Sequence, residues 1–248
     1  MTVLDAHTHM SGSPHDFLAM MDASGVDRAL VFTLDGLYVD PAPYNDRLAE
    51  FCAADPVRLI PFCSVHPRYP GAVPELRRCV TQLGMRGLKL HPWAQCLSLL
   101  DSSLDGIGQE LERFNVPVVF HDGTPPNSSP LQIAEFARRH ARVPVILGHG
   151  GLHDLWKEAV YAAERYPNIY LTPSSMPMHG FRWALARLPI ERFVFGSDAG
   201  LGDLYWQPFQ LAKVRSLHLR PDEEALILGG NAERMLARSG GCTAAFRG

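Results

Sequence analysis

The feature that most constrains the fold of this chain is a regular alternation of short apolar runs with longer amphipathic segments, repeated eight times along the sequence. Continuous runs rich in Val, Ile, Leu and Phe are typical of parallel strands that are buried on both faces. Strict alternation of strands and helices in turn implies a parallel sheet. The predicted strands occupy residues 3–9, 28–32, 58–63, 87–91, 116–121, 143–149, 168–171 and 192–198.

Each predicted strand is followed by a segment with helical spacing of its apolar residues or with a helix-start signal, such as Ser129-Pro130. The predicted helices occupy residues 14–23, 44–54, 74–83, 104–114, 130–140, 152–165, 181–188, 207–217, 221–228 and 231–238. Eight such units in 248 residues, 46% of them hydrophobic, match the roughly 250 residues of a closed barrel. The sequence therefore predicts one α/β domain over residues 1–248, a (β/α)8 or TIM barrel. An open doubly wound sheet is the alternative, disfavoured because no Gly-x-Gly-x-x-Gly follows the first strand.

Composition argues against nucleic acids and membranes as binding partners and indicates the cellular compartment. The net charge of -3, without a run of Lys or Arg, argues against a nucleic-acid partner. No apolar run approaches the ~20 residues of a membrane span, and the N-terminus enters the first predicted strand without a signal peptide. The cysteines are scattered and lack a Cys-x-x-Cys pair, which fits a reducing compartment and a cytoplasmic protein. They are Cys52, Cys63, Cys79, Cys96 and Cys242.

The first predicted strand ends in His7-Thr8-His9. Alternate side chains of a strand point to the same face, so we expect the two imidazoles to lie side by side. Imidazole is a good neutral ligand for zinc and related ions. An isolated pair of this kind is as often an ordinary surface feature, so the interpretation depends on whether later strands add further ligands.

Polar residues do gather at the ends of the later predicted strands, where the active site of a (β/α)8 barrel forms. Taken singly, each has an ordinary explanation, such as a hydrogen-bonded structural histidine, a capping aspartate or an ion-paired lysine. Their shared position at one rim favours a single site instead. The residues of this set are His7, His9, Lys89, His91, His121, His149 and Asp198.

Lys89 is the unusual member of the set. If Leu88 and Leu90 pack outward against helices, Lys89 and His91 face into the barrel. Burying an unpaired ammonium group is costly, so Lys89 needs a partner or an altered charge state.

These motifs resemble those of the amidohydrolase superfamily of metal-dependent barrels. From Asp5 to about Met235, the motifs resemble those of the "amidohydrolase-related" branch of this superfamily. That branch also contains the aminocarboxymuconate-semialdehyde decarboxylase group. The similar segments are Asp-Ala-His-Thr-His at 5–9, Gly-Leu-Lys-Leu-His-Pro at 87–92, Val-Val-Phe-His-Asp-Gly-Thr-Pro-Pro at 118–126, Gly-His-Gly-Gly at 148–151, Phe-Gly-Ser-Asp-Ala at 195–199 and Leu-Gly-Gly-Asn-Ala at 228–232.

The resemblance implies a divalent metal, usually zinc, held by the residues that match the family's ligands: His7, His9, His121 and Asp198. Asp198 would also accept a proton from metal-bound water. His149 would ligate a second metal or polarise the substrate. Lys89 stands where binuclear members carry a carboxylated lysine. The resemblance favours one bound ion and leaves a site with two ions as the alternative. Iron, manganese and nickel are the alternatives to zinc.

Three functions fit this set of residues. The first is hydrolysis of an amide, lactam, lactone or related bond in a small molecule, with Asp198 as general acid and base. The second is metal-dependent, non-oxidative decarboxylation of an unsaturated or aromatic carboxylic acid, with Arg182 or Arg86 holding the carboxylate. The third is a barrel that binds metal or ligand without turnover. The short chain favours hydrolysis, because the decarboxylases of this group are longer.

The substrate is a small molecule whose identity the sequence does not determine. Residues expected to contact it lie in the loops after the strands, where aromatic side chains could form pocket walls. They are His91, Trp93, His179 and Arg182. The sequence leaves a homo-oligomer open as the state of assembly.

Overall fold

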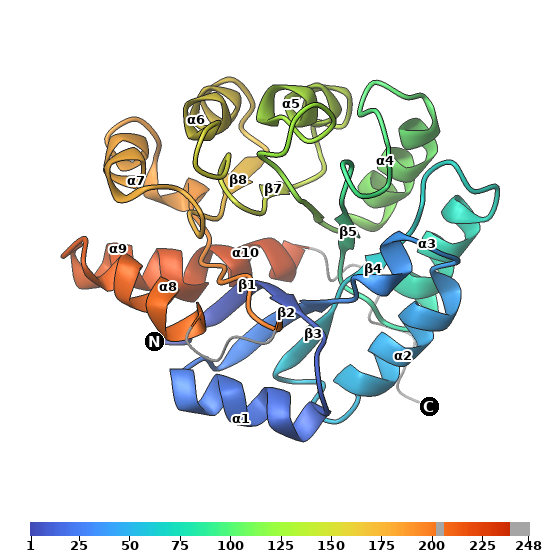
Figure 1. The fold of residues 1–248 in the computed structure, drawn as a ribbon, viewed down its shortest axis with the longest axis horizontal. Coiled ribbons are helices and arrows are strands. Elements are labelled where there is room, and N and C mark those ends of the chain that lie inside the picture. Colours follow the sequence, from blue (N-terminus) through green and yellow to red (C-terminus); the bar gives the residue numbers. More distant parts are fainter. Residues whose placement is uncertain (202–205, 239–248) are drawn as a thin grey trace.

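The structure is a computed structural model that describes residues 1–201 and 206–238, with helices surrounding a ring of parallel strands (Figure 1). The strands are β1 (Leu4–His9), β2 (Arg28–Phe32), β3 (Leu59–Pro61), β4 (Cys63–Ser64), β5 (Leu88–Leu90), β6 (Val118–Phe120), β7 (Val145–Leu147) and β8 (Ile169–Leu171). The helices between them are α1 (Pro14–Ser24), α2 (Ala42–Cys52), α3 (Ala72–Thr81), α4 (Ser103–Phe114), α5 (Pro130–Arg139) and α6 (Trp156–Arg165). After β8 come α7 (Met178–Leu185), α8 (Trp206–Arg215), α9 (Pro221–Ala225), a π-helical turn (Leu226–Gly230) and α10 (Asn231–Arg238).

The strands form two parallel sheets, β1-β2-β3 and β4-β5-β6-β7-β8. The sheets are continuous through Phe62, whose amide donates to the Val31 carbonyl at 3.0 Å, while the next amide, that of Cys63, donates to Gly87 at 2.9 Å. The single strand expected at 58–63 is thus present but divided, because its first half pairs with β2 and its second half with β5.

The ring closes through residues 193–199, which connect β8 to β1. The amide of Val194 donates to Leu171 at 3.0 Å, and Ala6 donates to the Phe195 carbonyl at 2.8 Å. A regular strand at 192–198 was expected, but this segment is extended and makes only isolated bridges. Near the end of the segment, Asp198 has a left-handed φ of 67°, which departs from strand geometry at that residue.

Helix boundaries agree with the sequence pattern within a few residues, except before α6. The helix expected from 152 begins at Trp156 instead. Gly150, Gly151 and Leu152 all have positive φ, so the chain after β7 forms turns rather than a helix. This longer loop gives the rim of the barrel a fixed, non-helical segment directly after His149.

Local signals explain why several helices begin where they do. The Ser13 side chain accepts a hydrogen bond from the Asp16 amide and Pro14 occupies the first turn of α1, which ends at Gly25 in the left-handed conformation. Ser129 caps α5 in the same way, followed by Pro130.

The core has two layers, which follow the alternation of side chains along the strands. Side chains on one face of the strands, including Leu88 and Leu90, pack against the helices. Side chains on the other face fill the barrel, where α10 closes one end with Met235 and Leu236. The inner set contains Leu4, Ala6, Leu30, Phe32, Ile60, Phe62, Val119, Ile146 and Val194. Lys89 lies between two outward leucines and is buried, as the alternation predicts.

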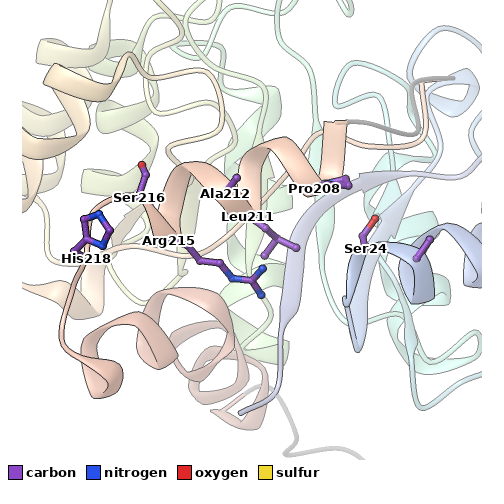
Figure 2. A pocket seen from close by; sticks show the side chains of 8 residues that line it. Ser24, Pro208, Leu211, Ala212, Arg215, Ser216 and His218 are labelled. Atoms are coloured by element: carbon purple, nitrogen blue, oxygen red, sulfur yellow. The ribbon is translucent and has the colours of Figure 1, made fainter.

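Helix α8 packs beside α1, and a shallow cavity of about 450 Å³ lies between them (Figure 2). Its lining includes Ser24, Leu211, Arg215 and His218, none of which belongs to the histidine-rich rim.

The four cysteines within the described residues are free, and Cys96 is the exposed one. Cys242 lies outside the described residues. Among the helices that the structure describes, none is both long and apolar enough to span a membrane.

The joint between the two sheets gives a stability test. A Cβ atom at Gly87 would lie 2.2 Å from the ring of Phe62, which is fully buried. We expect Gly87→Ala to lower the free energy of unfolding by about 1–3 kcal/mol, because the ring has no room to move away. Urea unfolding measures the change.

The matched control is Gly71→Ala, where a Cβ would have no neighbour within 4 Å. It should change the free energy of unfolding by less than about 0.5 kcal/mol. Equal effects of the two substitutions would contradict the packing assigned to Phe62.

Candidate metal centre

The first and last segments of the barrel bring two histidines and a carboxylate together. His7 and His9 lie on β1, and Asp198 ends the extended segment beside it. The Oδ1 atom of Asp198 lies 3.2 Å from Nε2 of His7 and 2.9 Å from Nε2 of His9. Both imidazoles therefore point to one spot, as expected for alternate residues of a strand.

The protonation of His7 is fixed by its neighbour on β7. Its Nδ1 atom lies 2.9 Å from the carbonyl oxygen of Gly148, which can only accept, so Nδ1 carries the proton. Burial lowers the pKa of His7 well below its usual value of 6.5, and the charge of Lys89 lowers it further. The ring is thus neutral, with the lone pair on Nε2, which is the form that a metal ion binds.

The side-chain nitrogen of Lys89 lies next to the lone pair on Nε2 of His7. This Nζ atom lies 3.1 Å from Nε2 of His7 and 5.0 Å from the ring centre of Phe32. Burial lowers the pKa of Lys89 to about 8, although the carboxylates of Asp198 and Asp122 act in the opposite direction. His7 therefore already offers its electron pair to a cationic group.

His121, His149 and His91 form a second row of imidazoles. The Nε2 atom of His149 lies 2.9 Å from Nδ1 of His121, and Nε2 of His121 lies 2.7 Å from the hydroxyl of Thr124. The ring of His91 stacks on that of His121, with centroids 3.7 Å apart. Burial lowers the pKa of His149 to about 4 and that of His91 to about 3, so these rings are also neutral near pH 7.

Asp198 is the ionised member of the group. Burial by itself would raise its pKa, but the hydrogen bond from His9 and the neighbouring His149, His9 and Lys89 hold the pKa of Asp198 below its usual 3.8. An ionised carboxylate only accepts, so Nε2 of His9 is the donor. The opposite ring atom of His9, Nδ1, is buried without a hydrogen-bond partner. It can take the ring proton and free Nε2 for a metal ion.

The donor set fits a divalent cation. Within the described residues, one ligand atom each from His7, His149 and Asp198 lies within 4.8 Å of the others. Two neutral imidazoles and an ionised carboxylate are ligands that zinc and manganese accept. This cluster contains His7 and Asp198 of the expected ligand set. His149, expected in a catalytic or second-metal role, is its third member, while His121 faces His149 and Thr124.

The expected substrate contacts are less closely gathered. Trp93 is exposed, with its ring 6.2 Å from that of His91. His179 packs its ring edge-on against Trp156 on α6, and Arg182 is exposed on α7. Only His91 of the four contacts the histidine cluster directly among the described residues. Arg86 precedes β5 and donates to the Leu236 carbonyl at the opposite end of the barrel.

Sequence reasoning missed two buried aspartates that shape the site. Asp122 accepts a hydrogen bond from the His149 amide at 2.6 Å and another from Gly151, and burial raises its pKa to about 6. Asp5 accepts hydrogen bonds from β1 and from Ser197. Both lie within two residues of a predicted ligand, and this proximity was the available signal.

The profile of the amidohydrolase family matches residues 5–238, which include the whole histidine cluster and Asp198. The chain belongs to this family. One curated relative, the gamma-resorcylate decarboxylase of Rhodococcus jostii (strain RHA1), is 34% identical over 93 residues. That alignment covers 34% of this chain and 28% of the relative.

Solved structures of two decarboxylases share the architecture. The 5-carboxyvanillate decarboxylase of Sphingomonas paucimobilis superposes with a TM-score of 0.74 at 17% identity, over 95% of this chain and 99% of that one. A 5-carboxyvanillate decarboxylase of Novosphingobium aromaticivorans, solved with bound manganese, gives 0.72 at 16% identity, over 90% and 80%. These likenesses confirm the predicted barrel fold.

Metal binding tests the cluster directly. We expect Mn²⁺ or Zn²⁺ to bind to the chelator-treated protein, and His7→Ala to weaken binding more than about 10-fold, since it removes a ligand. Isothermal titration calorimetry and metal content by mass spectrometry measure both. His15→Ala is the control, because that imidazole is exposed outside the cluster. Equal binding by wild type and His7→Ala would contradict the site.

Proposed function

We propose that this protein is a metal-dependent, non-oxidative decarboxylase of an aromatic carboxylic acid, with hydroxybenzoates as the first class to test. The observation that carries the proposal is the His7, His149 and Asp198 cluster at the strand ends of an amidohydrolase barrel. The proposal favours decarboxylation over the hydrolysis that the short chain suggested, because the named relatives are decarboxylases.

The charge of the site suits such a substrate. The imidazoles are neutral, and Lys89 supplies a positive charge that balances the negative charge of the ionised Asp198. A metal ion held by His7, His149 and Asp198, with His9 and His121 beside it, would add positive charge that binds the oxygens of the substrate. Manganese and zinc are the two ions to test first, since one similar structure was solved with manganese.

The reaction requires one proton. When the bond between the ring and the carboxylate breaks, carbon dioxide leaves and the electron pair stays on the ring carbon, which then takes a proton. Asp198 is the residue we assign to carry it: the ionised carboxylate first takes a proton from solvent water, and then passes this proton to the ring carbon, while His9 keeps its hydrogen bond to Oδ1. Its low pKa makes the protonated form a strong acid, which protonation of an aromatic carbon demands.

Reaction in D₂O separates decarboxylation from hydrolysis. We expect the Mn²⁺- or Zn²⁺-loaded protein to release carbon dioxide from a panel that includes 2,6-dihydroxybenzoate and 5-carboxyvanillate. The product should carry one deuterium at the carbon that bore the carboxylate, measured by proton NMR and mass spectrometry. Chelator-treated protein is the control. Cleavage of a lactone or amide panel without any release of carbon dioxide would support hydrolysis instead.

Asp198→Asn tests the assigned proton donor. Asparagine tolerates the left-handed φ of 67° at this position, so the fold should be kept. We expect kcat to fall about 10²–10⁴-fold, because the amide cannot transfer the proton, while a metal ion still binds. Asp154→Asn, at an exposed turn, is the matched control and should keep wild-type turnover. Turnover retained by Asp198→Asn would remove Asp198 from this role.

A further inference from the structure

We propose that Asp5 is the positioning residue of the metal centre: its buried carboxylate ties β1 to the segment before Asp198 and so holds Asp198 beside His7 and His9. The inference rests on the metal site of the proposed function, though not on the reaction that the site performs. Asp5 contacts no ligand atom itself; it acts through the backbone on both sides of the junction.

The Asp5 carboxylate accepts hydrogen bonds from three segments. Oδ1 accepts from the His7 amide at 3.2 Å and from the Ser197 amide at 2.9 Å. Oδ2 accepts from the Ser197 hydroxyl at 2.5 Å and from Nε2 of Gln207, on α8, at 2.9 Å. Asp5, Ser197 and Gln207 all have 0% exposure, so water does not compete for these bonds. A buried carboxylate is costly unless it is fully hydrogen-bonded, and this one is.

Asp198 needs such support because its backbone is strained. A left-handed φ costs an aspartate less than it costs most residues other than glycine, but the surrounding contacts still have to hold it. The Asp198 amide donates to the His7 carbonyl at 2.8 Å, which fixes one side. On the other side, the Ala199 amide donates to the Ser197 hydroxyl at 3.0 Å, the same hydroxyl that Asp5 holds. Asp5 therefore fixes the residue before Asp198 and, through Ser197, the residue after it.

The seam between β1 and residues 193–199 is also held by three backbone hydrogen bonds, from Ala6 to Phe195, from Asp198 to His7 and from His9 to Ala199. Its ladder is reduced to the isolated bridge between Thr8 and Ala199, and the side-chain hydrogen bonds of Asp5 add to these backbone contacts. At its start, the buried Asn231 amide donates to the carbonyls of Ile190 and Phe193 at 2.9 and 2.8 Å. Asn231 thus holds the start of residues 193–199 against α10, whereas Asp5 holds the other end against β1, and only the Asp5 end carries Asp198. This difference supplies a matched control.

Mn²⁺ affinity, measured by electron paramagnetic resonance without substrate, tests the assignment. We expect Asp5→Ala to weaken Mn²⁺ binding about 10–100-fold, as removal of the support of a metal ligand does. Asp5→Asn keeps an oxygen for the His7 and Ser197 amides and should recover most of the affinity. Asn231→Ala, which loosens the start of residues 193–199, should lower stability in urea but leave Mn²⁺ affinity within about twofold.

Ser197→Ala covers the case in which Asp5→Ala does not fold. It removes only the hydroxyl that joins Asp5 to the Ala199 amide, and we expect Mn²⁺ binding to weaken by at least threefold in folded protein. Wild-type Mn²⁺ affinity in folded Asp5→Ala or Ser197→Ala would overturn the proposal. So would an equal loss of affinity in Asn231→Ala, or absence of Mn²⁺ binding by the wild type.

The same measurement separates this inference from the proposed function. A wild-type protein that binds Mn²⁺ in an Asp5-dependent way but releases no carbon dioxide would refute the decarboxylase and support the positioning role. Decarboxylation by the wild type, together with unchanged Mn²⁺ affinity in the Asp5 variants, would support the decarboxylase and refute the positioning role of Asp5.

Discussion

The whole site depends on the junction at which the first strand meets the segment that closes the barrel. His9 and Asp198 are 189 residues apart in the chain, yet their side chains are 2.9 Å apart. The hydrogen bonds from Ala6 to Phe195 and from Asp198 to His7 close the ring and set that distance. Because parallel strands all end at the same rim, closing the barrel and assembling the site are one event.

Burial then gives the assembled groups their chemistry. It lowers the pKa of His7, His91 and His149, so that these rings are neutral, and the Gly148 carbonyl decides which nitrogen of His7 carries the proton. Asp198 stays ionised because hydrogen bonding and nearby positive charge outweigh its burial. Neutral imidazoles beside an ionised carboxylate are ligands that suit a divalent cation.

Much of the fold and site could be predicted from local patterns. Apolar runs predicted the parallel strands, and the alternation of side chains predicted that Lys89 faces into the barrel. The positions of the histidines at the strand ends predicted that they share one rim. The predictions were less accurate where distant contacts decide. The strand at 58–63 is divided between two neighbours, and the helix expected at 152 starts later because three residues have positive φ. His179 and Arg182 lie on a helix whose orientation no local pattern specifies.

The sequence by itself determined which chemical groups reach the rim and in what order, because periodicity and chain direction are local properties. The tertiary structure decided how those groups are held: the tautomer of His7, the left-handed backbone of Asp198 and the carboxylate of Asp5 that joins their segments. These features come from hydrogen bonds between residues far apart in the chain. Such bonds leave no periodic trace in the sequence, and so only the folded barrel reveals them.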